Sequence, residues 1–357
     1  MSSDLKLHPP SRRQLREKYM EALDPNQPIR MGLIHNPQAG RAHRWLDRVR
    51  LSRVLPESER IVTTRHESEV PAALERLLLE EQVNVIAIHG GDGTIHTTLN
   101  ALWEVLDTLQ KPNDAPLPLP SLIFLNGGTM NMTARAVGLR GGVSTALGKF
   151  KRATQLLHYG DLSTVPLSVL RVEDERKIRR GLIFGSELVH NAIDLHRHFG
   201  DGYTGLTRLL VKAGVGATLK TASWKHLSHL LSPPATPVQL DNITYAKYAA
   251  VVASTVDLQL VRGWVKAMKA CRGDQGFATK LILETNKQNL VNMIPTLLLN
   301  QTHEQIVDRK EVQCLRLKGP YTLDGELFRS DSNATCTVSL EPRSIPVVTF
   351  GESAHVS

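Results

Sequence analysis

Cysteine is scarce in this 357-residue chain, which contains only Cys271, Cys314 and Cys336. Three widely separated cysteines do not make a disulfide framework or a zinc cluster, so we expect buried thiols and a reducing compartment. Long apolar runs are lacking too. No stretch approaches the roughly 18 apolar residues of a membrane-spanning helix, and the N-terminal segment has no apolar core of a signal peptide. From these absences we expect a cytoplasmic protein.

Two common nucleotide-binding signatures are also missing. The chain has no GxxxxGK[ST] sequence, which argues against a P-loop NTPase. The stretch GGDGTI at residues 90–95 does not fit the GxGxxG pattern of an ordinary dinucleotide-binding dehydrogenase. A nucleotide site in this chain would therefore have to be built from other loops.

The residues that are present indicate a globular protein with a basic surface. Hydrophobic residues make up 41% of the chain and charged residues 22%, which is enough apolar material for two domains. Lys and Arg outnumber Asp and Glu by 43 to 35. The net charge of +8 favours anionic partners such as nucleic acid, nucleotide phosphates or lipid headgroups, and does not choose among them.

The pattern of the chain changes near residue 160. Before that point, apolar runs alternate with helical patterns, as in VNVIAIHGG followed by TIHTTLNALWEVLDTL, which predicts parallel βαβ units. After it, short and closely spaced β-like runs predict an antiparallel sandwich. We expect a basic extension over residues 1–28, an α/β, Rossmann-like domain over residues 29–158, and a β-rich domain over residues 159–350.

The stretch GGDGT at residues 90–94 lies between a predicted strand and a predicted helix. Glycines at such a point allow backbone N–H groups to approach a phosphate. Asp92 would repel a bare phosphate, so we expect it to face a divalent cation, a nucleophile or a nucleotide hydroxyl. The structural alternative is an ordinary strand-to-helix turn with Asp92 near the N-cap.

Two further loops support the first interpretation. HNPQAGRA follows the first predicted strand, and LNGGTMNMTAR follows the fourth. Because the carboxyl ends of parallel strands meet at one edge of a sheet, the three polar loops predict a single nucleotide site there.

These loops resemble the nucleotide-binding motifs of the diacylglycerol kinase catalytic domain family, which includes bacterial lipid kinases, sphingosine kinases and ceramide kinases. The similar stretches are NPQAGR, GGDGTIHTTLN and GTMNMTAR. A fourth stretch, GPYTLDGEL at residues 319–327, resembles the DGE motif near the C-terminal end of the family domain. The resemblance covers residues 30–330 and keeps the order of the motifs.

The resemblance implies transfer of the γ-phosphate of ATP, with Mg²⁺, to a lipid hydroxyl in a cleft between the two lobes. It implies that Asp324 is the general base, with Glu326 and Asp92 as the other catalytic carboxylates. Taken alone, Asp324 followed by Gly325 predicts only a hairpin turn. The nucleotide contacts implied by position are Asn36, Pro37, Gly40, Arg41, Thr64, Gly90, Gly91, Asp92, Gly93, Thr94, Ile95, His96, Thr129 and Asn131.

Three acidic positions of the family pattern are missing. Thr97 stands where Glu usually follows the glycine loop, and Met132 stands where an acidic residue commonly follows the Asn of the third motif. Gln275 replaces the second Asp of a turn that holds a structural Mg²⁺ in many bacterial members, which leaves Asp274 as a weaker metal ligand. We still expect an active enzyme, because three carboxylates remain: Asp92, Asp324 and Glu326.

Two other functions stay open at this point. An NAD kinase-like enzyme with a soluble substrate also uses a GGDGT loop, and a chain that has lost acidic residues could be a degenerate lipid or nucleotide sensor. The third motif and LDGE favour a lipid kinase of phospholipid biosynthesis that acts peripherally at a membrane surface. We expect a lipid substrate and no nucleic-acid partner, while the acceptor lipid and a homodimeric state are left undecided.

Overall fold

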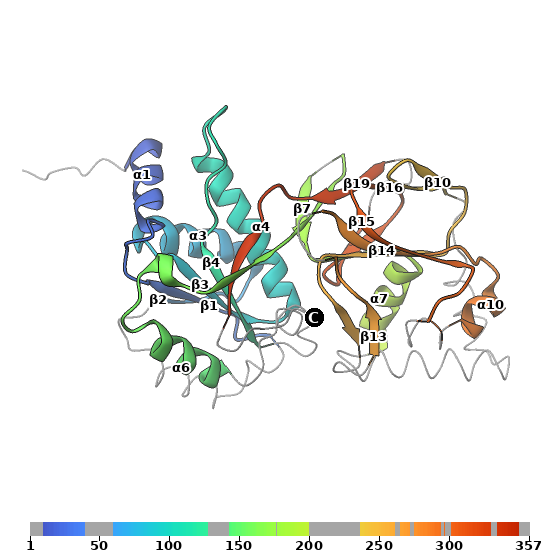
Figure 1. The fold of residues 1–357 in the computed structure, drawn as a ribbon, viewed down its shortest axis with the longest axis horizontal. Coiled ribbons are helices and arrows are strands. Elements are labelled where there is room, and N and C mark those ends of the chain that lie inside the picture. Colours follow the sequence, from blue (N-terminus) through green and yellow to red (C-terminus); the bar gives the residue numbers. More distant parts are fainter. Residues whose placement is uncertain are drawn as a thin grey trace, which may run out of the picture.

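The computed structural model describes residues 10–39, 60–127, 143–175, 177–199, 236–260, 265–271, 275–293, 296, 301–329 and 334–349. Within them the molecule has two lobes that lie side by side (Figure 1). The helical patterns at residues 41–55, 129–139 and 204–222 lie outside the described residues.

A six-stranded sheet forms the N-terminal lobe, in the order β2-β1-β3-β4-β20-β5. Its first four strands are parallel: β2 (Arg60–Thr63), β1 (Met31–His35), β3 (Val85–Gly90) and β4 (Ser121–Asn126). The other two strands come from the range predicted for the second domain. β20 (Ile345–Val348) pairs parallel with β4, and β5 (Thr164–Leu167) pairs antiparallel with β20. The chain therefore passes between the lobes again near its C-terminal end.

Helices cover both faces of this sheet (Figure 1). On one face lie α1 (Arg12–Ala22), the 3-10 turn η1 (Glu67–Glu69), α3 (Val70–Glu75), the π-helical turn η2 (Arg76–Glu80) and α4 (Asp92–Leu109). On the other face lies α6 (Val143–Thr154), which is followed by the 3-10 turn η3 (Tyr159–Asp161). The parallel strands are apolar along their whole length because both of their faces are buried, with Ile34 and Ile88 in one core and Leu33 and Ala87 in the other.

Two antiparallel six-stranded sheets form most of the C-terminal lobe. The first contains, in order, β10 (Ile243–Tyr245), β9 (Val238–Leu240), β16 (Leu315–Lys318), β19 (Thr335–Leu340), β6 (Leu170–Glu173) and β7 (Ile178–Gly181). The second contains β15 (Ile306–Val312), β14 (Phe277–Ile282), β11 (Ala250–Ser254), β8 (Ile183–Glu187), β17 (Tyr321–Leu323) and β18 (Glu326–Phe328). The remaining elements are a two-stranded sheet of β12 (Leu258–Leu260) and β13 (Val265–Met268), and the helices α7 (Leu188–Phe199) and α10 (Lys287–Asn292).

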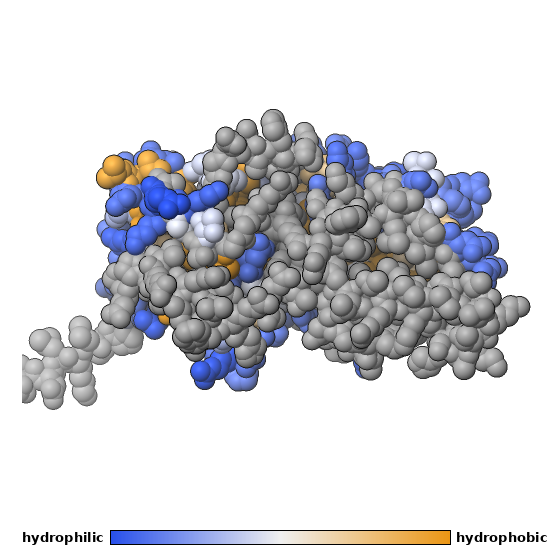
Figure 2. Space-filling view, turned by 90° about the horizontal axis from the view of Figure 1, so that it is seen from below, coloured by the Kyte–Doolittle hydropathy of each residue, from blue (hydrophilic) through white to orange (hydrophobic). Residues whose placement is uncertain are grey.

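The antiparallel sheets share one hydrophobic core, to which Leu170 and Val338 contribute from the first sheet and Phe184 and Phe277 from the second. This arrangement is a sandwich, so the predicted combination of a parallel α/β lobe and an antiparallel β lobe is confirmed. The coloured surface in Figure 2 is largely hydrophilic with smaller hydrophobic patches. Among the described residues, no helix has the length and apolar character needed to cross a bilayer.

Candidate active site

The loops that leave the parallel strands are bonded to one another at the carboxyl edge of the sheet. The backbone N–H of Asn36, after β1, donates to the carbonyl oxygen of His89 at 2.9 Å, and that of Thr64, after β2, donates to His35 at 2.9 Å. The side-chain amide of Asn36 also donates to the hydroxyl of Thr94 at 3.0 Å. Loops from separate parts of the sequence therefore lie together at this edge, as the alternation of strands and helices predicted.

The GGDGT turn is the start of helix α4. Gly91 is the N-cap in an extended conformation and Asp92 is the first helical residue, so the carboxylate lies just inside the helix. A Cβ on Gly127, at the end of β4, would lie 2.8 Å from the backbone nitrogen of Gly90, and one on Gly90 would collide with Thr94. Glycine is therefore required where these loops touch. The first turn of an 18-residue helix has N–H groups that the helix itself does not bond, together with the positive end of the helix dipole, and this favours an anion such as phosphate.

Helix α4 carries a polar stripe on an otherwise largely apolar surface. Asp92, His96 and Asn100 are spaced four residues apart, so they lie on one face of the helix. The Asn100 side chain joins α4 to β7 of the other lobe: its Nδ2 donates to the carbonyl oxygen of Arg180 at 2.8 Å, and the Arg180 backbone N–H donates to its Oδ1 at 2.8 Å. The stripe therefore faces the C-terminal lobe.

Asp324 and Gly325 form the turn of the β17–β18 hairpin. Both residues have positive φ, 54° for Asp324 and 89° for Gly325, as the short hairpin turns that favour Asp-Gly require. The structural interpretation of this dipeptide as a turn is correct. The same turn also directs the Asp324 side chain toward α4, so the turn and a role in the site are compatible.

The Asp324 carboxylate is buried between the lobes and accepts hydrogen bonds on both oxygens. Oδ1 accepts from the backbone N–H groups of Leu182 and Ile183, each at 2.9 Å. Oδ2 lies 3.1 Å from Nδ1 of His96, a residue 228 positions away in the sequence. Gly181 makes this approach possible, because a Cβ at that position would collide with Oδ2. The candidate base is therefore held against the helix that follows GGDGT.

Glu326 reaches the glycine loop itself. Its Oε1 lies 3.0 Å from the position that a Cβ on Gly93 would occupy. The carboxylates predicted to surround the nucleotide, Asp92 at the start of α4 and Glu326 at the start of β18, thus belong to the same part of the molecule.

A second buried contact lies at the junction of the lobes. The Arg180 guanidinium bonds to Glu341 through Nε at 2.6 Å, with only 10% of the Arg180 side chain and 6% of the Glu341 side chain exposed. The guanidinium also lies over the ring of Trp103 in α4, 5.2 Å from the ring centroid. These contacts fix the face of α4 that carries the polar stripe.

Two histidines lie directly beneath the loops. His35 and His89 end β1 and β3, are almost fully buried, and stack with ring centroids 4.9 Å apart and Nδ1 atoms 3.0 Å apart. Burial, together with the neighbouring His35, lowers the pKa of His89 to about 4. His89 is therefore neutral near pH 7, and the stacked pair belongs to the structural support of the loops.

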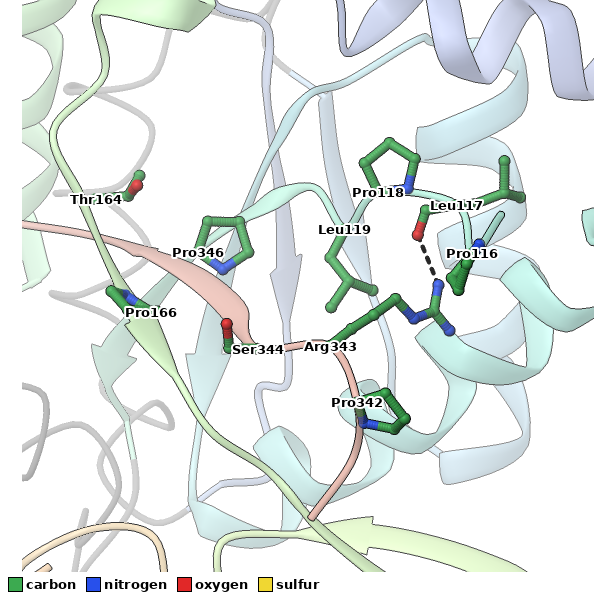
Figure 3. A pocket seen from close by; sticks show the side chains of 10 residues that line it. All are labelled: Pro116, Leu117, Pro118, Leu119, Thr164, Pro166, Pro342, Arg343, Ser344 and Pro346. Atoms are coloured by element: carbon green, nitrogen blue, oxygen red, sulfur yellow. Dashed lines mark hydrogen bonds between the residues drawn. The ribbon is translucent and has the colours of Figure 1, made fainter. Parts of the chain in front are cut away.

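A surface hollow of about 620 Å³ lies elsewhere, next to the strands that connect the lobes (Figure 3). The Arg343 side chain crosses it and donates to the carbonyl oxygen of Leu117 at 2.6 Å. None of the predicted site residues that the structure describes lines this hollow, which is formed by Pro116, Leu117, Pro118, Leu119, Thr164, Pro166, Pro342, Arg343, Ser344 and Pro346.

Some predicted site residues lie outside the described part of the chain, so nothing can be said of their surroundings: Gly40, Arg41, Thr129, Asn131, Met132 and Asp274. Other residues at the site were missed from the sequence. Asn100 could have been found from its spacing to Asp92 and His96, and the histidine pair from the fact that both predicted strands end in His just before a polar loop. The backbone N–H groups of residues 182 and 183, which donate to Asp324, could not have been found, because no sequence pattern marks them.

This geometry defines a class of two-lobed protein. Glycine-bearing loops at the carboxyl edge of an α/β sheet meet a carboxylate that an antiparallel lobe supplies. Residues 30–162 match the model of the diacylglycerol kinase catalytic domain. The resemblance seen in the motifs is therefore confirmed for the lobe that carries the first three of them. Because this domain belongs to a kinase family, the match supports a phosphotransferase activity for the protein.

Solved structures from Bacillus anthracis str. Sterne share the fold over both lobes. One, described as a candidate diacylglycerol kinase, has a TM-score of 0.61 at 18% identity and covers 91% of this chain and 97% of its own. Another, described as a diacylglycerol kinase, has a TM-score of 0.57 at 15% identity with the same coverage of 91% and 97%. A third, also described as a candidate diacylglycerol kinase, has a TM-score of 0.60 at 17% identity and covers 89% and 96%. At these identities the likeness establishes the fold. No curated protein matches the chain.

Proposed function

We propose that this protein is an ATP-dependent lipid kinase that transfers the γ-phosphate to the hydroxyl of a diacylglycerol-like or sphingoid- or ceramide-like lipid. The observation that carries the proposal is the 3.1 Å contact between His96 and Asp324. It brings a carboxylate of the antiparallel lobe to the helix whose N-terminus would hold the phosphates. Phosphoryl transfer to an alcohol needs this combination of an anion site and a nearby proton acceptor.

The glycine loop and the start of α4 are assigned to the phosphates of ATP. Their glycines let another molecule approach the backbone closely, and the helix dipole favours negative charge at Gly91 and Asp92. The hydrogen bond between Asn36 and Thr94 would fix the loop after β1 beside the GGDGT loop after β3. These groups would hold the phosphate chain in line with the acceptor hydroxyl.

Asp92 and Glu326 are the residues to which we assign Mg²⁺. The Glu326 carboxylate lies against Gly93, next to Asp92, and oxygen donors of this kind suit a hard divalent cation. When bound, the ion would offset the charge of the β- and γ-phosphates. Glu326 would then supply part of the negative charge that is missing because Thr97 stands in the place of a glutamate.

Asp324 is assigned to the part of the site that accepts the proton of the hydroxyl. Its two backbone donors fix the carboxylate rigidly, and its second oxygen is directed toward α4. The enzyme would act as a cytoplasmic protein at a membrane surface, where its basic surface would favour anionic headgroups. A lipid is then its partner, and nucleic acid is not.

The test is a transfer assay with γ-labelled ATP and Mg²⁺. The acceptors are diacylglycerol, monoacylglycerol, phosphatidylglycerol, a sphingoid base and ceramide in mixed micelles, with NAD in parallel. We expect label in one lipid class, a requirement for Mg²⁺, and a loss of at least about 100-fold in kcat for Asp324→Asn. Asp107→Asn, which changes an exposed carboxyl on α4, is the matched control.

Label found only in NADP would overturn the lipid assignment in favour of a soluble-substrate kinase. ATP and lipid binding without transfer to any acceptor would instead support a sensor that has lost activity.

A further inference from the structure

The Asp324 carboxylate is poorly placed to meet a lipid hydroxyl directly. Only 3% of its side chain is exposed, and both of its oxygens already accept hydrogen bonds from the protein. Oδ2 already accepts from His96, and the burial of the side chain leaves little room for a lipid hydroxyl beside it. The group that separates Asp324 from the face of α4 is therefore the His96 imidazole, of which 9% is exposed.

The hydrogen bonds of His96 define which ring nitrogen carries hydrogen. A carboxylate oxygen accepts, so Nδ1 donates to Oδ2 of Asp324 and Nε2 of the neutral ring keeps its lone pair. Nε2 lies 3.4 Å from the amide nitrogen of Asn100. That amide uses its two hydrogens in shorter bonds, to the carbonyl oxygens of His96 at 2.9 Å and Arg180 at 2.8 Å. Nε2 is left with only a long contact and can accept another hydrogen.

The position of His96 on α4 suits a proton acceptor for the transfer. It follows Asp92 by one helical turn, so its ring lies on the same face as the carboxylate at the start of the helix. Phe328 of β18 packs near the ring, with centroids 6.0 Å apart. The imidazole is thus in contact with Asp324, Asn100 and Phe328.

We propose that Nε2 of His96 is the atom that takes the proton from the acceptor hydroxyl, and that Asp324 is a positioning residue that acts through His96. The hydroxyl hydrogen passes to Nε2 as the hydroxyl oxygen bonds to the γ-phosphorus. The bond from that phosphorus to the bridging oxygen breaks, and ADP leaves. The resulting imidazolium, paired with Asp324, later gives its proton to water. This assignment rests on the proposed kinase function and identifies the atom that performs one step of it.

Steady-state kinetics with the accepting lipid test the proposal. We expect His96→Asn to lower kcat by about 100- to 1,000-fold while the KM for ATP changes by less than about threefold, because general-base catalysis contributes to the transition state. The matched control is His158→Asn, at the N-cap residue of η3, whose side chain is 63% exposed, and it should leave kcat unchanged. If His96→Asn keeps more than about one third of the kcat of the wild type, the proposal is wrong.

The double variant separates action through His96 from direct action by Asp324. If Asp324 works through the imidazole, His96→Asn combined with Asp324→Asn should be no slower than the slower single variant. Multiplying losses would show that Asp324 accepts the proton by itself and would overturn the assignment.

Nitrogen NMR of the protein with ¹⁵N-labelled histidine tests the geometry without any activity. We expect His96 to carry its hydrogen on Nδ1 in the wild type and to lose this preference in Asp324→Asn. Hydrogen on Nε2 in the wild type would overturn the proposal even in a fully folded protein. An absence of lipid phosphorylation by the wild type would refute the proposed function, while the NMR result would still decide whether the pair is arranged as a base.

Discussion

The two lobes contribute to the candidate site in different ways. In the N-terminal lobe, parallel strands end at one edge, and each polar loop is next in sequence to the strand that places it there. In the C-terminal lobe, the contributing residues sit on a hairpin, and the contacts of Asp324 come from residues 182 and 183 of its own lobe and from His96 of the other. Local motifs thus place the loops of the N-terminal lobe, whereas long-range packing places the hairpin of the C-terminal lobe.

The interface between the lobes is therefore as important as the loops. Along α4, Asn100 and Trp103 face Arg180 of β7, and His96 faces Asp324. Buried polar contacts are strong only when every partner is in place. Changes on the side of the C-terminal lobe should consequently alter the site without touching the nucleotide loops.

The largest expected effect on stability comes from the buried ion pair at the junction. Glu341→Gln should lower the free energy of unfolding by about 3 kcal/mol, because it leaves the buried Arg180 guanidinium with only the exposed Asp107 carboxylate, 3.9 Å away, as a charge partner. The control is Glu104→Gln, which breaks an exposed pair between α4 and Lys177 and should cost less than about 0.5 kcal/mol. Urea denaturation measures both, and equal effects would contradict the importance of burial at this junction.

Gly181→Ala should disturb the site from the C-terminal lobe alone. The new methyl group would collide with Oδ2 of Asp324 and lie 2.6 Å from Cγ of Leu323, so the carboxylate must move. Since a shift of about 1 Å in a catalytic group can cost 100-fold, we expect a loss of that order in kcat and a lower melting temperature. Gly148→Ala in α6, where no atom lies within 4 Å, should leave kcat unchanged and raise stability by up to about 1 kcal/mol. Unchanged kcat in both variants would show that Asp324 can move without consequence.

A buried carboxyl makes the C-terminal lobe less stable at high pH. Burial raises the pKa of Glu187 to about 7, although the Tyr248 hydroxyl, which donates to it at 3.4 Å, acts in the opposite direction. A folded-state pKa above the unfolded value means that the full stability is present below about pH 4.5 and is lost as the pH rises through 7. Glu187→Gln should remove this loss and raise the free energy of unfolding at pH 8 by about 2 kcal/mol relative to the wild type. Chemical denaturation at pH 5 and pH 8 measures the difference, and parallel losses in both proteins would refute it.

The histidine pair gives the N-terminal lobe the opposite dependence. Burial and His35 lower the pKa of His89 to about 4, so the unfolded chain binds a proton more readily than the folded one. The stability is fully present above about pH 6.5 and is lost as the pH falls toward 4. His89→Gln should reduce this loss by about 1–2 kcal/mol, which is less than the full shift because pH 4.5 still lies above the folded-state pKa. Denaturation curves at pH 7 and pH 4.5 test it, and an unchanged difference between the two curves would contradict the assignment to His89.

Much of the fold could be predicted from the sequence, and less of the site. The alternation of apolar runs such as VIAIHG with helical patterns predicted the parallel lobe, because strands buried on both faces must be apolar throughout. The final strand pair of that sheet was not predicted: β5 and β20 lie in the range assigned to the second domain. Pairing between residues so distant in sequence depends on how the chain passes back from the C-terminal lobe to the first sheet, which local sequence patterns do not encode.

What the sequence by itself determined are the local features: three polar loops after strands, a helix that begins at Asp92, and a turn at Asp324 and Gly325. Each follows from short-range chemistry, because glycine tolerates the backbone angles of a tight turn and Asp-Gly suits a hairpin turn that needs positive φ. Only the tertiary structure decided that the imidazole of His96 meets Asp324, and that this carboxylate is buried. The reason is that the contact joins elements of two different hydrophobic cores, and their relative placement is fixed by packing across the whole junction.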